Sequence, residues 1–256
     1  MNDGGNLMGT IDNKVAIVTG GGGGIGGAIV QRFAREGAKL AVADINPDAA
    51  QARVKEVADR GADAIALTSD VTDKQSVNDM VKATLDRWGK IDILVNVAGG
   101  AQRKNVVAIT ADDWDRVVNM NLKSVFLCSQ AVLPTMLKAK YGKIVSISSI
   151  YGFAGNATRS SYAAAKAGVA VFTKSLALEH VKDGININAI APGRIETPAV
   201  RSHYSDEAWA AAEAQIPMGH TGKPENIASA AIFLVQDENN YITGQTIHVN
   251  GAWLNW

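Results

Sequence analysis

The fold follows from one stretch near the start of the chain, VAIVTGGGGGIGGAIVQRFA at residues 15–34. Its first five residues are mostly apolar or β-branched, as in a buried strand, and its last seven suit a helix. Seven of the eight residues from Gly20 to Gly27 are glycine, so the backbone can turn tightly and approach a ligand closely. A strand that runs through glycines into a helix aims the first helical amides at a phosphate. We therefore expect a phosphate-binding turn here rather than a flexible linker.

The same alternation of strand-like and helix-like segments continues to the end of the chain. Apolar or β-branched runs occur at residues 15–18, 40–43, 64–67, 91–95, 144–147, 185–190 and 245–249. Helix-forming runs occur at residues 29–35, 48–60, 76–88, 112–138 and 224–235. This order is typical of βαβ units whose parallel strands are buried on both faces. We predict an α/β fold with a Rossmann-type, doubly wound parallel sheet in a three-layer α/β/α arrangement.

The chain of 256 residues is expected to form a single domain over residues 13–256, because α/β folds of this length commonly remain undivided. Residues 1–12 lack both a basic start and an apolar core, so we predict a loose N-terminal tail and no signal peptide. Residues 194–218 interrupt the alternation near the carboxyl end of the sheet, where ligands bind. We predict that they form a small substrate lid; surface decoration is the alternative.

The composition points to a small molecule as the partner. Lysine plus arginine and aspartate plus glutamate number 25 each, which favours neither nucleic acid nor a membrane surface. No apolar run approaches the roughly 20 residues of a membrane helix. The single cysteine, Cys128, cannot form an internal disulfide and is expected to be buried, which suits a cytoplasmic location. The histidines are scattered and predict no metal site: His180, His203, His220 and His248.

Asp44 stands at the end of the second strand-like run. It follows the glycine turn at about the spacing of the acidic residue that bonds the adenosine ribose hydroxyls in dinucleotide-binding folds. Its carboxylate would repel a 2′-phosphate, and no lysine or arginine occurs between Gly20 and Gly27. Ile45, rather than a basic residue, follows it. The pattern favours NAD over NADP, and a turn residue before Asn46 is the alternative.

Tyr162 and Lys166 lie four residues apart in a strongly helical segment, which places them on one face of the helix. A free tyrosine has a pKa of about 10, and a neighbouring ammonium group lowers it toward the range where a general acid or base works well. This spacing is common by itself, and two exposed helix residues are the plain alternative. The pair indicates proton transfer only together with other motifs.

Several motifs, taken in order, resemble those of the short-chain dehydrogenase/reductase family. Residues 19–26 fit the family's TGxxxGxG turn, and Tyr162 with Lys166 fits its YxxxK pair. Other residues that fit family motifs are Asp70-Val71, Asn96-Val97-Ala98-Gly99, Asn121, Ser149, Pro192-Gly193 and Thr197. Val97 departs from the usual NNAG motif but leaves its glycine in place. The resemblance covers nearly the whole chain and implies an NAD-dependent oxidoreductase that acts on a CH–OH group.

The resemblance also implies catalytic roles. Tyr162 would be the general acid/base, and Lys166 would lower its pKa while bonding the nicotinamide ribose. Ser149 would bond the substrate oxygen, and Asn121 would position a water that links Lys166 to solvent. Ser148 is the alternative to Ser149, but adjacent strand residues face opposite sides, and the family spacing selects Ser149.

The same resemblance implies the residues that bind the cofactor. The pyrophosphate would face Gly20, Gly24, Ile25 and Gly26. The adenine would face Asp70 and Val71, and the adenosine ribose side of the cleft would face Asn96, Ala98 and Gly99. The nicotinamide end would be held by Pro192, Gly193, Ile195 and Thr197. Asp44, Tyr162 and Lys166 complete the predicted NAD site, and no metal is required.

The substrate is expected between the segments that follow Gly99 and Ser149 and the predicted lid. The expected substrate contacts are Arg103, Ser149, Tyr151, Arg194 and His203. Such a polar and aromatic lining suits a secondary alcohol that is polar or anionic, for instance a sugar-like or cyclic hydroxy compound, and that is oxidised to a ketone or lactone. Arginines that face solvent or pair with acids are the alternative.

Two other functions are weighed. A reductase of 3-oxoacyl groups on acyl carrier protein is disfavoured, because Pro134 and Leu178 stand where such enzymes carry basic docking residues. A non-catalytic NAD-binding scaffold is disfavoured by the intact set of catalytic motif residues. Family resemblance further implies a homotetramer, a dimer of dimers, and the aromatic segment 251–256 is consistent with burial against a neighbour or against its own core.

Overall fold

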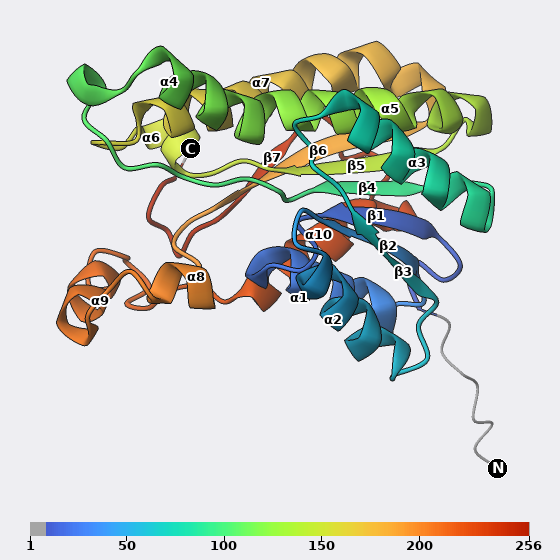
Figure 1. Ribbon diagram of the computed structural model, residues 1–256, viewed down its shortest axis with the longest axis horizontal. Coiled ribbons are helices and arrows are strands. Elements are labelled where there is room, and N and C mark those ends of the chain that lie inside the picture. The colour runs from blue at the N-terminus through green and yellow to red at the C-terminus, as the bar shows by residue number, and fades with distance from the viewer. Residues whose placement is uncertain (1–8, 256) are drawn as a thin grey trace.

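The computed structural model describes residues 9–255, and the strands in this part of the chain form one seven-stranded parallel sheet (Figure 1). The strand order is β3-β2-β1-β4-β5-β6-β7. The chain adds β2 and β3 on one side of β1 and then β4 to β7 on the other side, so the order of the strands reverses between β1 and β4. The bounds are β1 Val15–Thr19, β2 Lys39–Asp44, β3 Ala64–Thr68, β4 Ile93–Asn96, β5 Gly142–Ile147, β6 Ile185–Pro192 and β7 Thr246–Val249. The predicted doubly wound Rossmann-type sheet is confirmed.

Helices cover both faces of this sheet (Figure 1). One face carries α1 (Gly24–Arg35), α2 (Pro47–Ala58) and α10 (Pro224–Val235). The other carries α3 (Lys74–Trp88), α5 (Ser124–Ala139) and α7 (Ser160–His180), with α4 (Ala111–Val118) packed on α7. The short elements are η1 Val106–Ala108, η2 Asn119–Lys123, α6 Tyr151–Ala154, η3 Val181–Asp183, α8 Pro198–Arg201, α9 Asp206–Glu213 and η4 Asp237–Asn239. Among residues 9–255, no helix has the length and apolarity to cross a membrane.

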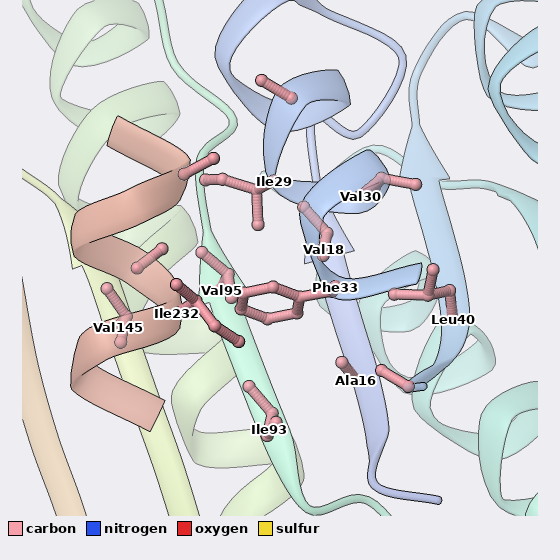
Figure 2. Packing of buried hydrophobic residues seen from close by; sticks show 14 of the residues in the cluster. Ala16, Val18, Ile29, Val30, Phe33, Leu40, Ile93, Val95, Val145 and Ile232 are labelled. Atoms are coloured by element: carbon pink, nitrogen blue, oxygen red, sulfur yellow. The ribbon is translucent and has the colours of Figure 1, made fainter. Parts of the chain in front are cut away.

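The two faces of β1 supply two separate cores, because side chains alternate along a strand. Val18 packs toward Phe33 of α1 and Ile232 of α10, as Figure 2 shows. Ile17 faces the opposite layer. That layer also buries Cys128, as expected, and burial raises the pKa of its thiol to about 12. A strand sealed on both faces fixes the position of the loop that leaves it.

The long helix predicted over residues 112–138 contains an irregular turn. A turn of π-helix, η2, separates α4 from α5. The side chain of Asn121 in this turn donates to the carbonyl of Val117, four residues earlier, at 2.9 Å. A side chain that takes this carbonyl competes with the regular backbone bond. The predicted helix is therefore present without a gap from Ala111 to Ala139, but it contains one π-helical turn, which amphipathic periodicity does not reveal.

Two predicted boundaries also move toward the N-terminus. The helix expected from residue 29 begins at Gly24, so that the later glycines form its first turn. The ordered chain includes residues 9–12, which were predicted as part of a loose tail. Ile11 is buried, and the side chain of Glu36 accepts hydrogen bonds from the amide and hydroxyl of Thr10. The prediction for residues 1–8 lies outside the described residues.

Residues 194–218 contain α8 and α9, beyond the carboxyl end of β6 (Figure 1). Thr197 caps α8 by accepting a bond from the amide of Val200, and Trp209 of α9 is buried. The segment therefore has its own helices and core contacts. Its role as a lid stays a prediction.

Candidate active site

The candidate site lies where β1 and β4 end, at the reversal of the strand order. Loops that leave two such strands diverge and open a crevice between them. Thr19, the last residue of β1, ties the two loops together. Its hydroxyl oxygen accepts hydrogen bonds from the amides of Val97 and Ala98 at 3.1 and 3.3 Å. The glycine turn thus forms one wall of the crevice, and the loop after β4 forms the other.

Two positions in the glycine turn require glycine. Gly20 has a φ of 64°, and a Cβ there would lie 3.0 Å from the backbone of Ala98. A Cβ on Gly26 would lie 2.1 Å from the carbonyl oxygen of Gly20. At Gly23, by contrast, the nearest atom would be 3.4 Å away. The turn is a close-packed backbone cradle, unlike a flexible linker.

The first turn of α1 leaves its backbone amides available to an anion. Its N-cap residue, Gly23, has no side chain that could accept their hydrogen bonds, and the turn contains no acidic residue. In contrast, Asn46 caps α2 and Asp73 caps α3 through their side chains. Free N–H groups at a helix start attract negative charge. The turn therefore fits the pyrophosphate of a dinucleotide.

Asp44 places a carboxylate beside this turn. One carboxylate oxygen accepts a bond from the amide of Gly22 at 3.0 Å, and the other accepts one from the amide of Asn46 at 3.0 Å. The residue is half-buried, so its charge is held in place next to the glycines. The bond to Asn46 gives Asp44 a turn-forming role as well, the alternative expected for it.

The loops after β3 and β4 differ in the side-chain groups that they could present to a cofactor. One carboxylate oxygen of Asp70 accepts bonds from the amide and hydroxyl of Thr72 at 2.8 and 2.7 Å, so its own loop uses that oxygen, and Val71 beside it is buried. The side chain of Asn96 is buried and donates to Ser146 at 3.1 Å. It therefore points into the protein interior, and only its backbone could serve the cofactor as predicted.

The segment after β6 runs past the glycine turn. Gly193 allows close approach of the chain to Asn250, since a Cβ there would lie 2.8 Å from its Cα. Ile195 is buried, and a Cβ on Gly24 would lie 2.7 Å from the Thr197 side chain. A cavity of about 440 Å³ is lined by Gly24 and Thr197, and also by Pro198 and Ala199. The structure thus brings Thr197 to the predicted pyrophosphate residues.

Tyr162 and Lys166 lie together on α7, with the ammonium nitrogen 5.7 Å from the centre of the phenol ring. Ser149 follows β5, and its hydroxyl is near enough to the Tyr162 phenol to lower the pKa of that phenol. The neighbouring Ser148 is buried and donates to the backbone carbonyl of Lys166 at 2.8 Å. Of the two serines, Ser149 is therefore the one that meets the tyrosine.

Burial governs the protonation of this pair. Burial raises the pKa of the Tyr162 phenol, and the nearby Ser149 hydroxyl and the charge of Arg159 offset only part of this effect. Burial also lowers the pKa of Lys166 to about 8, while its ammonium donates to the carbonyl of Ile147 at 2.7 Å. The pKa of Tyr162 was expected to be lowered. It is raised instead, because the loss of hydration destabilises the phenolate more than the nearby groups stabilise it.

Asn121 is buried and tied to the loop after β4. Its amide donates to the carbonyl of Gly100 at 2.7 Å, and its oxygen accepts a bond from the amide of Gly100 at 3.2 Å. A Cβ on Gly99 would lie 2.6 Å from the Asn121 oxygen and 3.4 Å from the Lys166 nitrogen. Glycine at this position keeps a space between the two side chains. A water relay of the predicted kind would need that space.

The predicted substrate residues are only partly brought together. Arg103 donates to the hydroxyl of Tyr204 at 2.5 Å, and the guanidinium carbon of Arg194 lies 5.3 Å from the centre of the same ring. Tyr151 joins this group through Trp253, with ring centres 6.4 Å apart. His203 is exposed, and within residues 9–255 its side chain forms no hydrogen bond. It is not brought into the group.

Comparison with known proteins identifies the family. The family model described as enoyl-(acyl carrier protein) reductase matches residues 20–253, which include the glycine turn, Ser149, Tyr162 and Lys166. The chain belongs to the short-chain dehydrogenase/reductase family. It is therefore an oxidoreductase, and the family binds a nicotinamide dinucleotide.

Individual relatives of this short-chain dehydrogenase/reductase cover almost the whole chain. The 3-oxoacyl-[acyl-carrier-protein] reductase FabG of Thermotoga maritima is 39% identical over 242 residues, which are 94% of this chain and 98% of the relative. The 2,5-dichloro-2,5-cyclohexadiene-1,4-diol dehydrogenase LinX of Sphingobium indicum is 37% identical over 240 residues, with 94% and 96% covered. The crystal structure of gox2181 superposes with a TM-score of 0.92 at 36% identity and covers 96% of this chain and 97% of that one.

Two residues of this short-chain dehydrogenase/reductase were not predicted as part of the site. Thr19 was considered only as the first residue of the TGxxxGxG motif, although it accepts two hydrogen bonds from the loop after β4 and so shapes the crevice. Trp253 was assigned to the terminal segment, but it packs on Tyr151 and lies 5.4 Å from the guanidinium carbon of Arg194. Its aromatic character so near the chain end was the available signal.

Proposed function

We propose that this protein transfers a hydride between NAD and the carbinol carbon of a small secondary alcohol, with Tyr162 as the proton donor or acceptor. The observation that carries the proposal is the grouping of Tyr162 with the buried Lys166 on one face of α7, with Ser149 close enough to lower the pKa of the Tyr162 phenol. This group lies on elements that end at the same crevice as the glycine turn and Asp44. The relatives named above include both a ketone reductase and a diol dehydrogenase.

The residues divide the proton chemistry among them. Ser149 holds the substrate oxygen by a hydrogen bond and keeps it beside the Tyr162 hydroxyl. In alcohol oxidation the Tyr162 phenolate takes the hydroxyl proton, and in ketone reduction the phenol returns it. Lys166 favours the phenolate by its positive charge, and Asn121 faces the space through which a proton would leave. The nicotinamide, when bound, accepts or supplies the hydride, so that both bonding electrons of the C–H bond are accounted for.

The cofactor residues fit a dinucleotide with free ribose hydroxyls. Gly20 and Gly26 let the turn pack tightly against Ala98 and on itself, and the uncapped first turn of α1 offers amides to a pyrophosphate. Asp44 can accept bonds from two ribose hydroxyls, and its charge opposes a 2′-phosphate. These features support NAD rather than NADP.

The test is a screen of NAD reduction across secondary alcohols, sugars, cyclic diols and hydroxy acids, with NADP in parallel. We expect turnover with NAD, and the Tyr162→Phe variant should lose at least about a thousandfold in kcat while still binding NADH, because it keeps the ring but not the proton. Thr173→Val, another hydroxyl of α7, is the control. If Tyr162→Phe retains full turnover, the proposal is overturned. If wild type turns over no substrate and Tyr162→Phe binds NADH equally well, the scaffold alternative gains.

A second function is supported by the names of relatives. FabG proteins are 3-oxoacyl-[acyl-carrier-protein] reductases, and the family model carries an acyl-carrier name as well. Against it stand the apolar residues Pro134 and Leu178, the latter exposed on α7. Reduction of a 3-oxoacyl carrier substrate faster than any free ketone would select this alternative.

Location and assembly complete the proposal. The cytoplasmic location remains a prediction from cysteine content. The predicted homotetramer is supported by apolar side chains on the outer faces of α5 and α7, where Phe126, Val171 and Leu178 are exposed.

A further inference from the structure

Three arginines from separate segments converge on the substrate side of the crevice. Arg103, in the loop after β4, donates to the hydroxyl of Tyr204 at 2.5 Å. Arg194, at the start of the 194–218 segment, has its guanidinium carbon 5.3 Å from the centre of the Tyr204 ring. Arg159, just before α7, has its guanidinium carbon 5.2 Å from the centre of the Tyr151 ring. Segments far apart in the sequence thus place three positive charges in one region.

These charges are not neutralised by the described part of the chain. Within residues 9–255, Arg103, Arg159 and Arg194 take part in no salt bridge. Arg201, in the same segment as Arg194, is by contrast paired with Asp206. One terminal nitrogen of Arg194 is buried and has no hydrogen-bond partner among these residues. Like charges and an unsatisfied buried donor are costly unless an anion joins them.

Aromatic rings hold the guanidinium groups in place without neutralising their charge. Trp253 lies 5.4 Å from the guanidinium carbon of Arg194, and Tyr204 lies next to both Arg103 and Arg194. A cation over an aromatic face is stabilised while its N–H donors stay free for other bonds. The cluster is therefore pre-organised for a ligand.

The positive charges of these arginines also act on nearby tyrosines, including the predicted acid/base Tyr162. Burial alone would raise the pKa of Tyr204, but the bond from Arg103 and the charges of Arg194 and Arg159 outweigh it and lower that pKa. The charge of Arg159 acts on Tyr162 as well. An anion bound by the cluster would thus lie within electrostatic reach of the substrate hydroxyl.

We propose that Arg103, Arg159 and Arg194 bind an anionic group of the substrate, a carboxylate or a phosphate carried by the hydroxy compound. The inference rests on the proposed function and narrows its substrate class. The planar fork of arginine donors matches the oxygens of either group, and each such bond is charge-assisted. A neutral alcohol would leave the three guanidinium groups without a counter-ion.

Direct binding tests the cluster without turnover. Acetate and inorganic phosphate are titrated into the NADH complex by calorimetry, for wild type and for the single variants Arg103→Gln, Arg159→Gln and Arg194→Gln. We expect each variant to weaken the better-bound anion by about ten- to a hundredfold, the loss of one charge-assisted bond. Arg60→Gln, an exposed arginine at the end of α2, is the control and should bind as wild type does. The anion with higher affinity identifies the group as carboxylate or phosphate. Unchanged affinity for both anions in all three variants would overturn the proposal.

Kinetics then separates this inference from the function on which it rests. Wild type is compared on hydroxy carboxylates and sugar phosphates against matched neutral methyl esters and free sugars. We expect KM for the anionic member to be at least about tenfold lower, and the Arg194→Gln variant to lose this difference between the two members. Equal KM values within every pair, with normal Tyr162-dependent turnover, would overturn the anionic substrate and leave the proposed function intact. Turnover independent of Tyr162 would overturn the proposed function, while the titrations still decide the anion site.

Discussion

Tyr162 keeps its proton at neutral pH in this structure, because burial raises its pKa above the ordinary value. Ketone reduction needs the phenol and alcohol oxidation needs the phenolate. Below a raised pKa the phenolate fraction increases tenfold per pH unit. We therefore expect kcat/KM for oxidation to rise between pH 6 and pH 7.5, below the pKa of about 8 at which Lys166 loses its charge, while that for reduction stays flat. Initial rates in both directions with a fixed ionic strength check this, and an oxidation rate independent of pH would contradict it.

At the same scale, Asp44 should decide the choice of cofactor. Asp44→Ala removes the negative charge next to Gly22, so KM for NAD should rise by about ten- to a hundredfold, while KM for NADP should fall or stay unchanged. Asp48→Ala, an exposed aspartate in the first turn of α2, is the control. Steady-state titration with each cofactor measures the ratio. An unchanged preference for NAD would contradict the role of Asp44.

Single residues also show how far sequence reasoning reaches. Strand alternation predicted that Ser148 and Ser149 face different sides; both lie just beyond the end of β5, and the structure gives them different surroundings. The motif spacing does not show where the side chain of Asn96 points, because its orientation is set by hydrogen bonds with Ser146 and Ser129 from elements distant in the sequence. The raised pKa of Tyr162 likewise depends on burial by the folded chain.

At the scale of elements, the junction of β1 and α1 is close-packed and can be tested position by position. Gly26→Ala would force a Cβ to within 2.1 Å of a backbone oxygen, whereas Gly23→Ala would meet nothing closer than 3.4 Å. We expect Gly26→Ala to lose NADH affinity by at least about a hundredfold, or to lower the melting temperature clearly, because the turn must shift. Gly23→Ala is the matched control and should bind NADH within about threefold of wild type. Fluorescence titration and thermal unfolding measure both, and equal behaviour of the two variants would contradict the geometry.

The elements were predictable to different degrees. β1 and α10 could be predicted because a buried apolar run and a proline at a helix start are local signals. The turn η2 could not, because the Asn121 side chain in it bonds both Val117, four residues earlier, and Gly100 in the loop after β4, and apolar periodicity shows neither bond. The burial of Ile11 was not predicted either, because a single apolar residue is too short a pattern to indicate a buried segment.

At the scale of the whole molecule, assembly is the open structural prediction. Val171 and Leu178 lie seven residues apart on α7, on one face, and are 60% and 79% exposed. Val171→Asp would put a charge into an apolar interface, so we expect sedimentation to show dimers or monomers instead of tetramers. Val107→Asp, at a valine that is 93% exposed in η1, is the control and should leave the assembly unchanged. Wild type that sediments as a monomer at micromolar concentration would contradict the tetramer.

The contact between Gly24 and Thr197 has a consequence for the order of events in turnover. Thr197 starts α8, the first helix of the 194–218 segment, and its side chain lies against the turn expected to hold the pyrophosphate. A dinucleotide bound to that turn would therefore also fix the start of the segment that is expected to cover the substrate. We therefore expect compulsory-order kinetics in which the dinucleotide enters first and leaves last. NADH should then inhibit competitively against NAD and non-competitively against the alcohol, whereas a random order would give competitive patterns against both.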